Sequence, residues 1–356
     1  MRLTRLIARD VRNLKAIDWR PAPGLNLLVG PNGGGKTSVL EAIHLAALGR
    51  SFRTRDTSQI VRHGTLGLSI SAWFETPDQR DFHVRMDRDG SGTRLSLDGR
   101  QLRAASELAR TLPILPLSQD GVRRFRMSRG ERRSLLDWGL FHVEPEFHRS
   151  WVRYHTALAQ RNAALRSGQP SKPWLEALVG DGELLTKSRE AYVLRLQSHV
   201  ERVSERLELG LEVTLEFSRG WRDGLPLAAY WSEAENSDRK LGYTSGGPHR
   251  ANLGFRSRDR LGMEQMSAGQ AKLLYLVLRL AQLDELLDGQ PEPTPIVFVD
   301  DLAAELDNRH VTAVLATLAA HKLQRFVTSP AFDADLVADA DALFHVEQGA
   351  LLSAPH

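Results

Sequence analysis

The sequence predicts an α/β fold that combines a mixed sheet, an antiparallel β-meander and an inserted, mainly helical lobe. Three observations carry this prediction. A short apolar run at 25–29 leads through a glycine-rich segment into a helical pattern at 36–48, which is typical of a buried strand followed by a helix. Residues 67–99 alternate apolar and polar positions and contain two Asp-Gly turns, as antiparallel strands do. Residues from about 128 to 210 have a helical pattern instead.

The remaining elements follow from the same two periodicities. Further strands are predicted at 2–9, 14–19, 112–117, 211–217, 296–299 and 325–328. Further helices are predicted at 100–110, 151–166, 174–209, 272–287 and 310–321. Gly180 and Gly182 predict a break in the longest of these helices. We expect residues 1–118 and 291–356 to form a first lobe, and residues 119–290 to form a second, mainly helical lobe.

The glycine-rich segment predicts a phosphate-binding loop. It reads Gly-Pro-Asn-Gly-Gly-Gly-Lys-Thr and fits the pattern G-x-x-x-x-G-K-[ST]. Glycines let the backbone approach an anion closely, and the start of the following helix adds partial positive charge. Lys36 is predicted to reach the β- and γ-phosphates of ATP, and the Thr37 hydroxyl to bind Mg²⁺. An ordinary glycine-rich turn is the alternative, which the strand–loop–helix context disfavours. The predicted nucleotide-binding residues are Gly30, Pro31, Asn32, Gly33, Gly34, Gly35, Lys36, Thr37 and Ser38.

Two carboxylates follow the apolar run at 296–299. A strand that ends at Asp300 can present this side chain to Mg²⁺, so Asp300 and Thr37 are the predicted metal ligands. Asp301 is then placed to orient or deprotonate a water molecule, and it is the predicted catalytic residue together with Lys36. Carboxylates commonly end strands, so this interpretation depends on the phosphate-binding loop.

A second candidate phosphate-binding segment is Ser267-Ala-Gly-Gln270, at the start of a long helical pattern. Its spacing predicts a capping box between Ser267 and Gln270, and a capped helix start beside a glycine is also an anion site. The segment is similar to the Leu-Ser-Gly-Gly-Gln signature that ABC ATPases place against the γ-phosphate held by another subunit, with departures at Met266 and Ala268. We therefore expect Ser267, Gly269 and Gln270 to contact nucleotide in a dimer.

The composition limits the classes of protein to which the chain can belong. The chain has 356 residues, of which 42% are hydrophobic and 26% charged, as in globular proteins. It contains no run of about eighteen apolar residues, so no membrane span is expected. The first residues lack the apolar core of a secretory signal. With no cysteine, disulfides and thiolate metal sites are excluded, and a cytoplasmic location is expected.

Arginine dominates the positive charge, with 40 Arg and 7 Lys in a chain of net charge +3. A GC-rich genome would produce the same bias. Six arginines nevertheless lie within residues 123–133, a density that indicates a polyanionic partner. A solvated helix face with Glu131 nearby is the alternative interpretation. The predicted DNA-binding residues are Arg123, Arg124, Arg126 and Arg129.

Several segments carry a resemblance to a known family. They are Gly30 to Ile43 with Gly49-Arg-Ser-Phe-Arg53, Arg132-Arg-Ser-Leu-Leu-Asp137, Gly247-Pro-His-Arg250, and Asp300-Asp-Leu-Ala-Ala-Glu-Leu-Asp307. Together they resemble the RecF family of bacterial recombination mediators. The Gly-Pro-His-Arg motif is the most specific of these, and the phosphate-binding loop is the least specific. The resemblance extends through nearly the whole chain.

The resemblance implies an ABC-type P-loop ATPase head without a long arm. ATP would drive formation of a homodimer that binds double-stranded DNA and junctions of single-stranded and double-stranded DNA. RecR, RecO and RecA would be partners in gap repair, with RecA loading as the outcome, and slow ATP hydrolysis would release the dimer. Two positions depart from the family pattern. Gln119 stands where a Glu is usual and is predicted to contact Mg²⁺ or water, and Thr328, at the place of a switch histidine, is predicted to sense the γ-phosphate.

Other classes remain as alternatives. A transporter nucleotide-binding subunit would be shorter, with a stronger signature and a switch histidine. An SMC-like structural head would need a long coiled coil, and the residues between Thr37 and Ser267 are too few for one. An overcoming-lysogenisation-type nuclease would need a further acidic domain after Asp307. A P-loop kinase acting on a small molecule would not need the Ser267 surface.

Overall fold

The computed structural model describes residues 1–54, 56–103, 106–109, 111–209, 212–257, 265–289, 294–301, 306–332 and 334–353. The chain divides into two compact units. The first unit consists of Met1–Arg123 and Gln290–His356, and the second consists of Arg124–Gly289. Among the residues that the structure describes, no helix has the length and apolar character needed to cross a bilayer.

A mainly parallel sheet forms the centre of the first unit. Its strands, in the order β14-β13-β3-β12-β11-β8, are β14 (Ala350–Ser353), β13 (Ala342–Glu347), β3 (Leu25–Val29), β12 (Arg325–Ser329), β11 (Ile296–Asp300) and β8 (Ile114–Ser118). All neighbours are parallel except β13 and β14. The register pairs Asp300 with Ser118, and Thr328 with Leu28, so the carboxyl ends of β3, β12, β11 and β8 lie along one edge. Pro116 is tolerated because β8 is the last strand of the sheet and needs hydrogen bonds on one side only.

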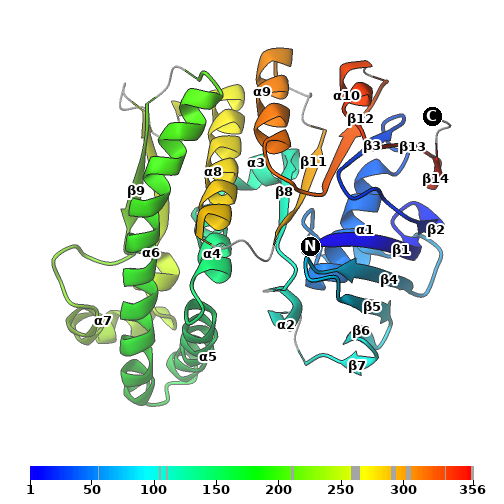
Figure 1. Cartoon of the computed structure of the whole chain (residues 1–356). Coiled ribbons are helices and arrows are strands. Elements are labelled where there is room, and N and C mark those ends of the chain that lie inside the picture. Colours follow the sequence, from blue (N-terminus) through cyan, green and yellow to red (C-terminus); the bar gives the residue numbers. More distant parts are fainter. Residues whose placement is uncertain are drawn as a thin grey trace. The chain divides into compact units, whose positions relative to one another are not determined.

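An antiparallel sheet is the second layer of this unit. Its order is β2 (Leu14–Trp19), β1 (Arg2–Val11), β4 (Leu68–Glu75), β5 (Asp81–Asp89), β6 (Gly92–Leu97) and β7 (Arg100–Gln101). This confirms the predicted meander. The helix α1 (Lys36–Leu48) is almost entirely buried and shares one hydrophobic core with both sheets, which Figure 1 shows as α1 lying beside β1 and β4. The burial of α1 on nearly all sides holds its first turn in a fixed place.

Four further helices are described within the first unit. They are η1 (Thr57–Ile60), α2 (Ser106–Ala109), α9 (Asn308–Ala319) and α10 (Ala334–Ala338). The helix predicted at 100–110 is wrong in its first part, because Arg100–Gln101 pairs with β6 as a strand after the turn at Asp98-Gly99. The helix α3 (Gln119–Met127) runs across the division between the two units.

The second unit is mainly helical. Its helices are α4 (Arg129–Val143), α5 (Phe147–Arg166), α6 (Lys172–Arg206), α7 (Leu227–Leu241), η2 (Pro248–Arg250) and α8 (Ala268–Gly289). A two-stranded sheet of β9 (Val213–Ser218) and β10 (Asn252–Ser257) completes it. In Figure 1, α6 and α8 run side by side, which agrees with their contacts.

The predicted break near Gly180 and Gly182 is wrong, since α6 is continuous through both positions. At Gly182 a Cβ atom would lie 2.8 Å from a methyl carbon of Leu227 and 3.3 Å from the Tyr154 ring. The glycine therefore serves close packing of α6 against its neighbours and not a turn.

Candidate nucleotide-binding site

The phosphate-binding loop joins β3 to α1 as predicted. Gly35 precedes the helix with φ 118°, a conformation that favours glycine, and no side chain of the described chain caps α1. The first N–H groups of a helix have no partners within the helix, so an uncapped start suits an anion. The loop is thus built for phosphate at the residues that the sequence pattern indicates.

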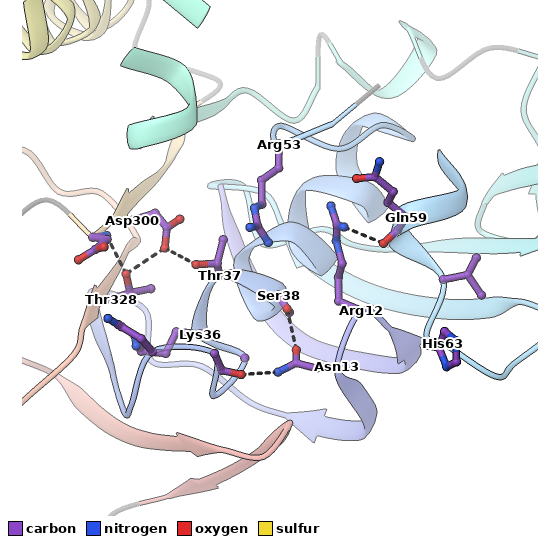
Figure 2. A pocket seen from close by; sticks show the side chains of 15 residues that line it. Arg12, Asn13, Lys36, Thr37, Ser38, Arg53, Gln59, His63, Asp300 and Thr328 are labelled. Atoms are coloured by element: carbon purple, nitrogen blue, oxygen red, sulfur yellow. Dashed lines mark hydrogen bonds between the residues drawn. The ribbon is translucent and has the colours of Figure 1, made fainter. Parts of the chain in front are cut away.

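Contacts from distant segments hold the loop in shape. The Asn13 side chain donates to the Gly33 carbonyl oxygen at 2.8 Å and accepts a hydrogen bond from Ser38 Oγ at 2.8 Å (Figure 2). The Gly349 N–H, in the turn between β13 and β14, donates to the Gly34 carbonyl oxygen at 2.9 Å. A Cβ atom at Gly349 would lie 2.1 Å from the Asn13 carbonyl oxygen. Neither Asn13 nor this hairpin was predicted from the sequence, in which the Gln348-Gly349 turn is a local signal for the hairpin.

Lys36 lies inside the loop. Its Nζ donates to the carbonyl oxygens of Gly30 at 2.6 Å and Pro31 at 3.1 Å, and the residue is 8% exposed. Burial lowers the pKa of Lys36, while the charges of Asp301 and Asp300 oppose that shift. An ammonium group has three donors, so one is left for a phosphate oxygen.

The predicted metal ligands are brought together. Thr37 Oγ1 donates to Asp300 Oδ1 at 2.9 Å, and Thr328 Oγ1 donates to the same oxygen at 3.0 Å (Figure 2). Burial raises the pKa of Asp300, and the hydrogen bonds from the two threonines and the charge of Arg53 act in the opposite direction. Carboxylate and hydroxyl oxygens are the ligands that Mg²⁺ prefers, and it usually completes its shell with water and substrate phosphates. These residues therefore fit a nucleotide-bound Mg²⁺ ion.

Asp301 follows directly and has an unusual backbone. Its φ of 53° lies in the left-handed region, which non-glycine residues seldom adopt. Its N–H donates to Thr328 Oγ1 at 2.9 Å, and the residue lines the same cavity as Lys36. Such backbone strain is frequent at functional sites.

The cavity at the loop has a volume of about 500 Å³. Away from the phosphate-binding loop it is lined by Arg12, Arg53, Gln59, Val61 and His63 (Figure 2). Arg12 is fixed by two hydrogen bonds to the buried Glu41 carboxylate, at 2.8 and 2.9 Å, and donates to the Gln59 carbonyl oxygen. This end offers mixed polar and apolar surface next to the phosphate site, so the cavity suits a nucleotide.

Gln119 is not brought into this cavity. It is exposed at the start of α3, one residue after Ser118, which pairs with Asp300. It is absent from the described residues that line the cavity. Its contact with Mg²⁺ or water stays a prediction.

The predicted capping box at the start of α8 is confirmed. The Ser267 N–H donates to Gln270 Oε1 at 2.9 Å, and the Gln270 N–H donates to Ser267 Oγ at 3.2 Å. Ser267 is exposed, and a Cβ atom at Gly269 would meet no atom within 4 Å. These residues belong to the second unit and present an open helix start.

The arginine cluster separates into two groups. Arg123, Arg126 and Arg129 are exposed, and Arg124 is half-buried with an ion pair to Glu131 at 3.6 Å. The arginines of the other group make hydrogen bonds within the second unit. Arg132 is buried and donates to the Leu253 and Phe125 carbonyl oxygens, each at 3.0 Å. The cluster thus leaves three exposed arginines at its N-terminal end.

The Gly-Pro-His-Arg segment is a structural turn. Gly247 has φ 135°, and His249 Nδ1 lies 2.7 Å from the Tyr154 hydroxyl, while its Nε2 lies 3.0 Å from the Thr244 carbonyl oxygen. Burial lowers the pKa of His249 to about 4. A neutral imidazole satisfies both contacts, with Nε2–H donating and Nδ1 accepting. Arg250 is exposed and lies over the Tyr243 ring.

A mixed α/β unit with this loop, and a helical unit with a capped signature segment, define an ABC-type P-loop ATPase head. Known proteins of this class are similar to the chain. The family model described as the RecF/RecN/SMC N terminal domain matches residues 2–351. A solved structure of the recombination mediator protein RecF-ATP has a TM-score of 0.87 at 21% identity and covers 99% of this chain and 97% of its own. An Smc head domain derived from Pyrococcus furiosus has a TM-score of 0.61 at 16% identity, covering 99% of this chain and 95% of its own.

The curated relatives place the chain within one branch of that class. The protein named DNA replication and repair protein RecF from Stenotrophomonas maltophilia (strain R551-3) is 40% identical, covering 100% of both chains. RecF from Chromohalobacter salexigens is 36% identical over 99% of this chain and 100% of its own. The chain therefore belongs to the RecF family of DNA replication and repair proteins.

Proposed function

We propose that this chain is an ATP-driven switch of recombinational gap repair. ATP binds at the Lys36 loop, and Thr37 and Asp300 hold its Mg²⁺ ion, which neutralises phosphate charge when bound. A second copy contributes Ser267, Gly269 and Gln270 to each site, so two chains join while the γ-phosphate is present. Asp301 orients the attacking water, and slow hydrolysis removes the contact that joins the two chains.

One observation carries this proposal. The chain has both a cavity at the glycine loop, where the Thr37 hydroxyl and the Asp300 carboxylate meet, and an open, capped helix start with an unobstructed glycine. A kinase for small metabolites would need only the first of these. The similarity to the solved structure of RecF-ATP in the RecFOR pathway supports ATP as the nucleotide.

The dimer is proposed to bind double-stranded DNA and gap junctions in the cytoplasm and to help load RecA together with RecO and RecR. Arg123, Arg124, Arg126 and Arg129 are the proposed phosphate contacts. Arginine suits this role because its guanidinium group matches a phosphate with two parallel hydrogen bonds. Such contacts are made to phosphates and not to bases. A protein that uses them can therefore select DNA by its shape without reading the base sequence.

The test combines mass and DNA binding. Fluorescence anisotropy on a short duplex and light scattering are measured with ATP, with ADP and without nucleotide. We expect the mass to double and the duplex to be bound with ATP, and neither to happen with ADP or without nucleotide. Doubling without DNA binding would keep the ATP-driven dimer and favour a role toward protein partners. No doubling in ATP would refute the switch.

The arginine proposal has its own prediction. Replacing Arg123, Arg126 and Arg129 together by glutamine should weaken duplex binding in ATP and reduce the slope of log affinity against log salt by about 3, because each phosphate contact contributes about 0.9. Arg149→Gln on α5 is a matched control, since Arg149 is exposed but already paired with Glu146. An unchanged slope in the triple variant would remove these arginines from the interface.

A further inference from the structure

Thr328 bridges the two adjacent carboxylate residues. It lies near the end of β12, beside β11, and is 4% exposed. Its Oγ1 accepts a hydrogen bond from the Asp301 N–H at 2.9 Å. It donates its proton to Asp300 Oδ1 at 3.0 Å, as Figure 2 shows. A hydroxyl has one proton and two lone pairs, so its donor is used and one lone pair remains.

This arrangement bears on the sequence-based prediction that Thr328 senses the γ-phosphate. A phosphate oxygen accepts hydrogen bonds and cannot use a lone pair on Thr328. To donate to the phosphate, Thr328 would have to release Asp300 while Asp300 holds Mg²⁺. The observed contacts therefore favour a role toward the carboxylates and not toward the nucleotide.

The backbone of Asp301 explains why a bridge is needed. Its φ of 53° is disfavoured for a residue with a side chain, so the surrounding structure has to impose it. The bond from the Asp301 N–H to Thr328 fixes the peptide group between Asp300 and Asp301. Because Thr37 donates to the same Asp300 oxygen at 2.9 Å, Thr328 also links this peptide group to the metal ligands.

We propose that Thr328 is a positioning residue for hydrolysis, which holds Asp301 in its left-handed conformation and Asp300 in its orientation toward Thr37. The inference rests on the proposed ATPase function of the site. It assigns Thr328 no contact with nucleotide. A threonine hydroxyl can both accept from the backbone and donate to the carboxylate, and a serine hydroxyl keeps both abilities.

The experiment compares Thr328→Val, which keeps the shape and removes the hydroxyl, with Thr328→Ser, which keeps the hydroxyl. Thr328→Val should lower kcat for ATP hydrolysis at least about tenfold, while the affinities for ATP and ADP both stay within about threefold, the pattern of an interaction needed only in the transition state. Thr328→Ser should retain kcat within about threefold of the original protein.

Three outcomes would overturn the inference. Full activity in Thr328→Val would show that the bridge is not needed. Selective loss of ATP affinity relative to ADP would assign Thr328 to the γ-phosphate instead. Failure of Thr328→Ser to retain activity would make the role one of packing. If Thr328→Val does not fold, Thr328→Ala gives the same comparison. An original protein that neither binds nor hydrolyses ATP would refute the proposed function itself, a result visible before any variant is made.

Discussion

Replacing Lys36 by methionine should reduce ATP affinity roughly 10- to 150-fold, because a hydrogen bond to a charged group contributes about 1.5–3 kcal/mol and about 1.4 kcal/mol is a factor of ten in affinity. Methionine keeps much of the length of the side chain and removes the charge. It also removes the hydrogen bonds from Nζ to the Gly30 and Pro31 carbonyl oxygens, which shape the loop. Isothermal titration with ATP measures the loss.

The charge of Lys36 gives this prediction a pH dependence. Burial lowers the pKa of Lys36, so the ammonium group loses its proton at a lower pH than an ordinary lysine. Since phosphate binding needs the charged form, ATP affinity of the original protein should fall as pH rises toward that lowered pKa. Lys15→Met, at an exposed position of β2 in the same unit, should change neither the affinity nor its pH dependence. An ATP affinity in Lys36→Met close to that of the original protein would contradict the assignment of the loop.

The parts of the site that were predicted from the sequence are mainly those formed by residues close together along the chain. Leu25–Val29, the glycine loop and Lys36–Leu48 have the predicted bounds, because strand, turn and helix each leave a local signal in composition. Thr37 and Asp300 were predicted to be Mg²⁺ ligands, and they lie together because parallel strands bring their carboxyl ends to one edge of a sheet.

The missed parts depend on contacts between distant segments. Asn13 and Gly349 hold the loop from about twenty residues before it and more than three hundred after it, and nothing in their own neighbourhoods indicates phosphate. The arginine cluster is a second case in which the local sequence does not reveal the role of a residue. Arg132 is buried against β10 while Arg129, three residues earlier, is exposed, and only the packing of the second unit separates them.

Gly269 leads to a prediction in which stability and assembly change in opposite directions. The glycine lies in the first turn of α8, its φ is not in the left-handed region, and a Cβ atom there would meet nothing within 4 Å. Nothing in the described chain therefore requires glycine at this position. Gly269→Ala should raise the free energy of unfolding of the monomer by about 0.5 kcal/mol, because alanine favours helix over glycine.

The same substitution should weaken the ATP-driven dimer at least about tenfold, because a methyl group on this turn would block the close approach of a phosphate to the helix start, which glycine permits. Gly180→Ala is the matched control. Gly180 is an exposed glycine within α6 whose Cβ would also meet nothing within 4 Å, so this variant should gain stability without losing the dimer. Thermal unfolding without nucleotide and light scattering in ATP separate the two effects. A Gly269→Ala protein that dimerises in ATP as readily as Gly180→Ala would mean that the signature turn does not meet a phosphate, and the function of its unobstructed glycine would have to be sought outside the dimer.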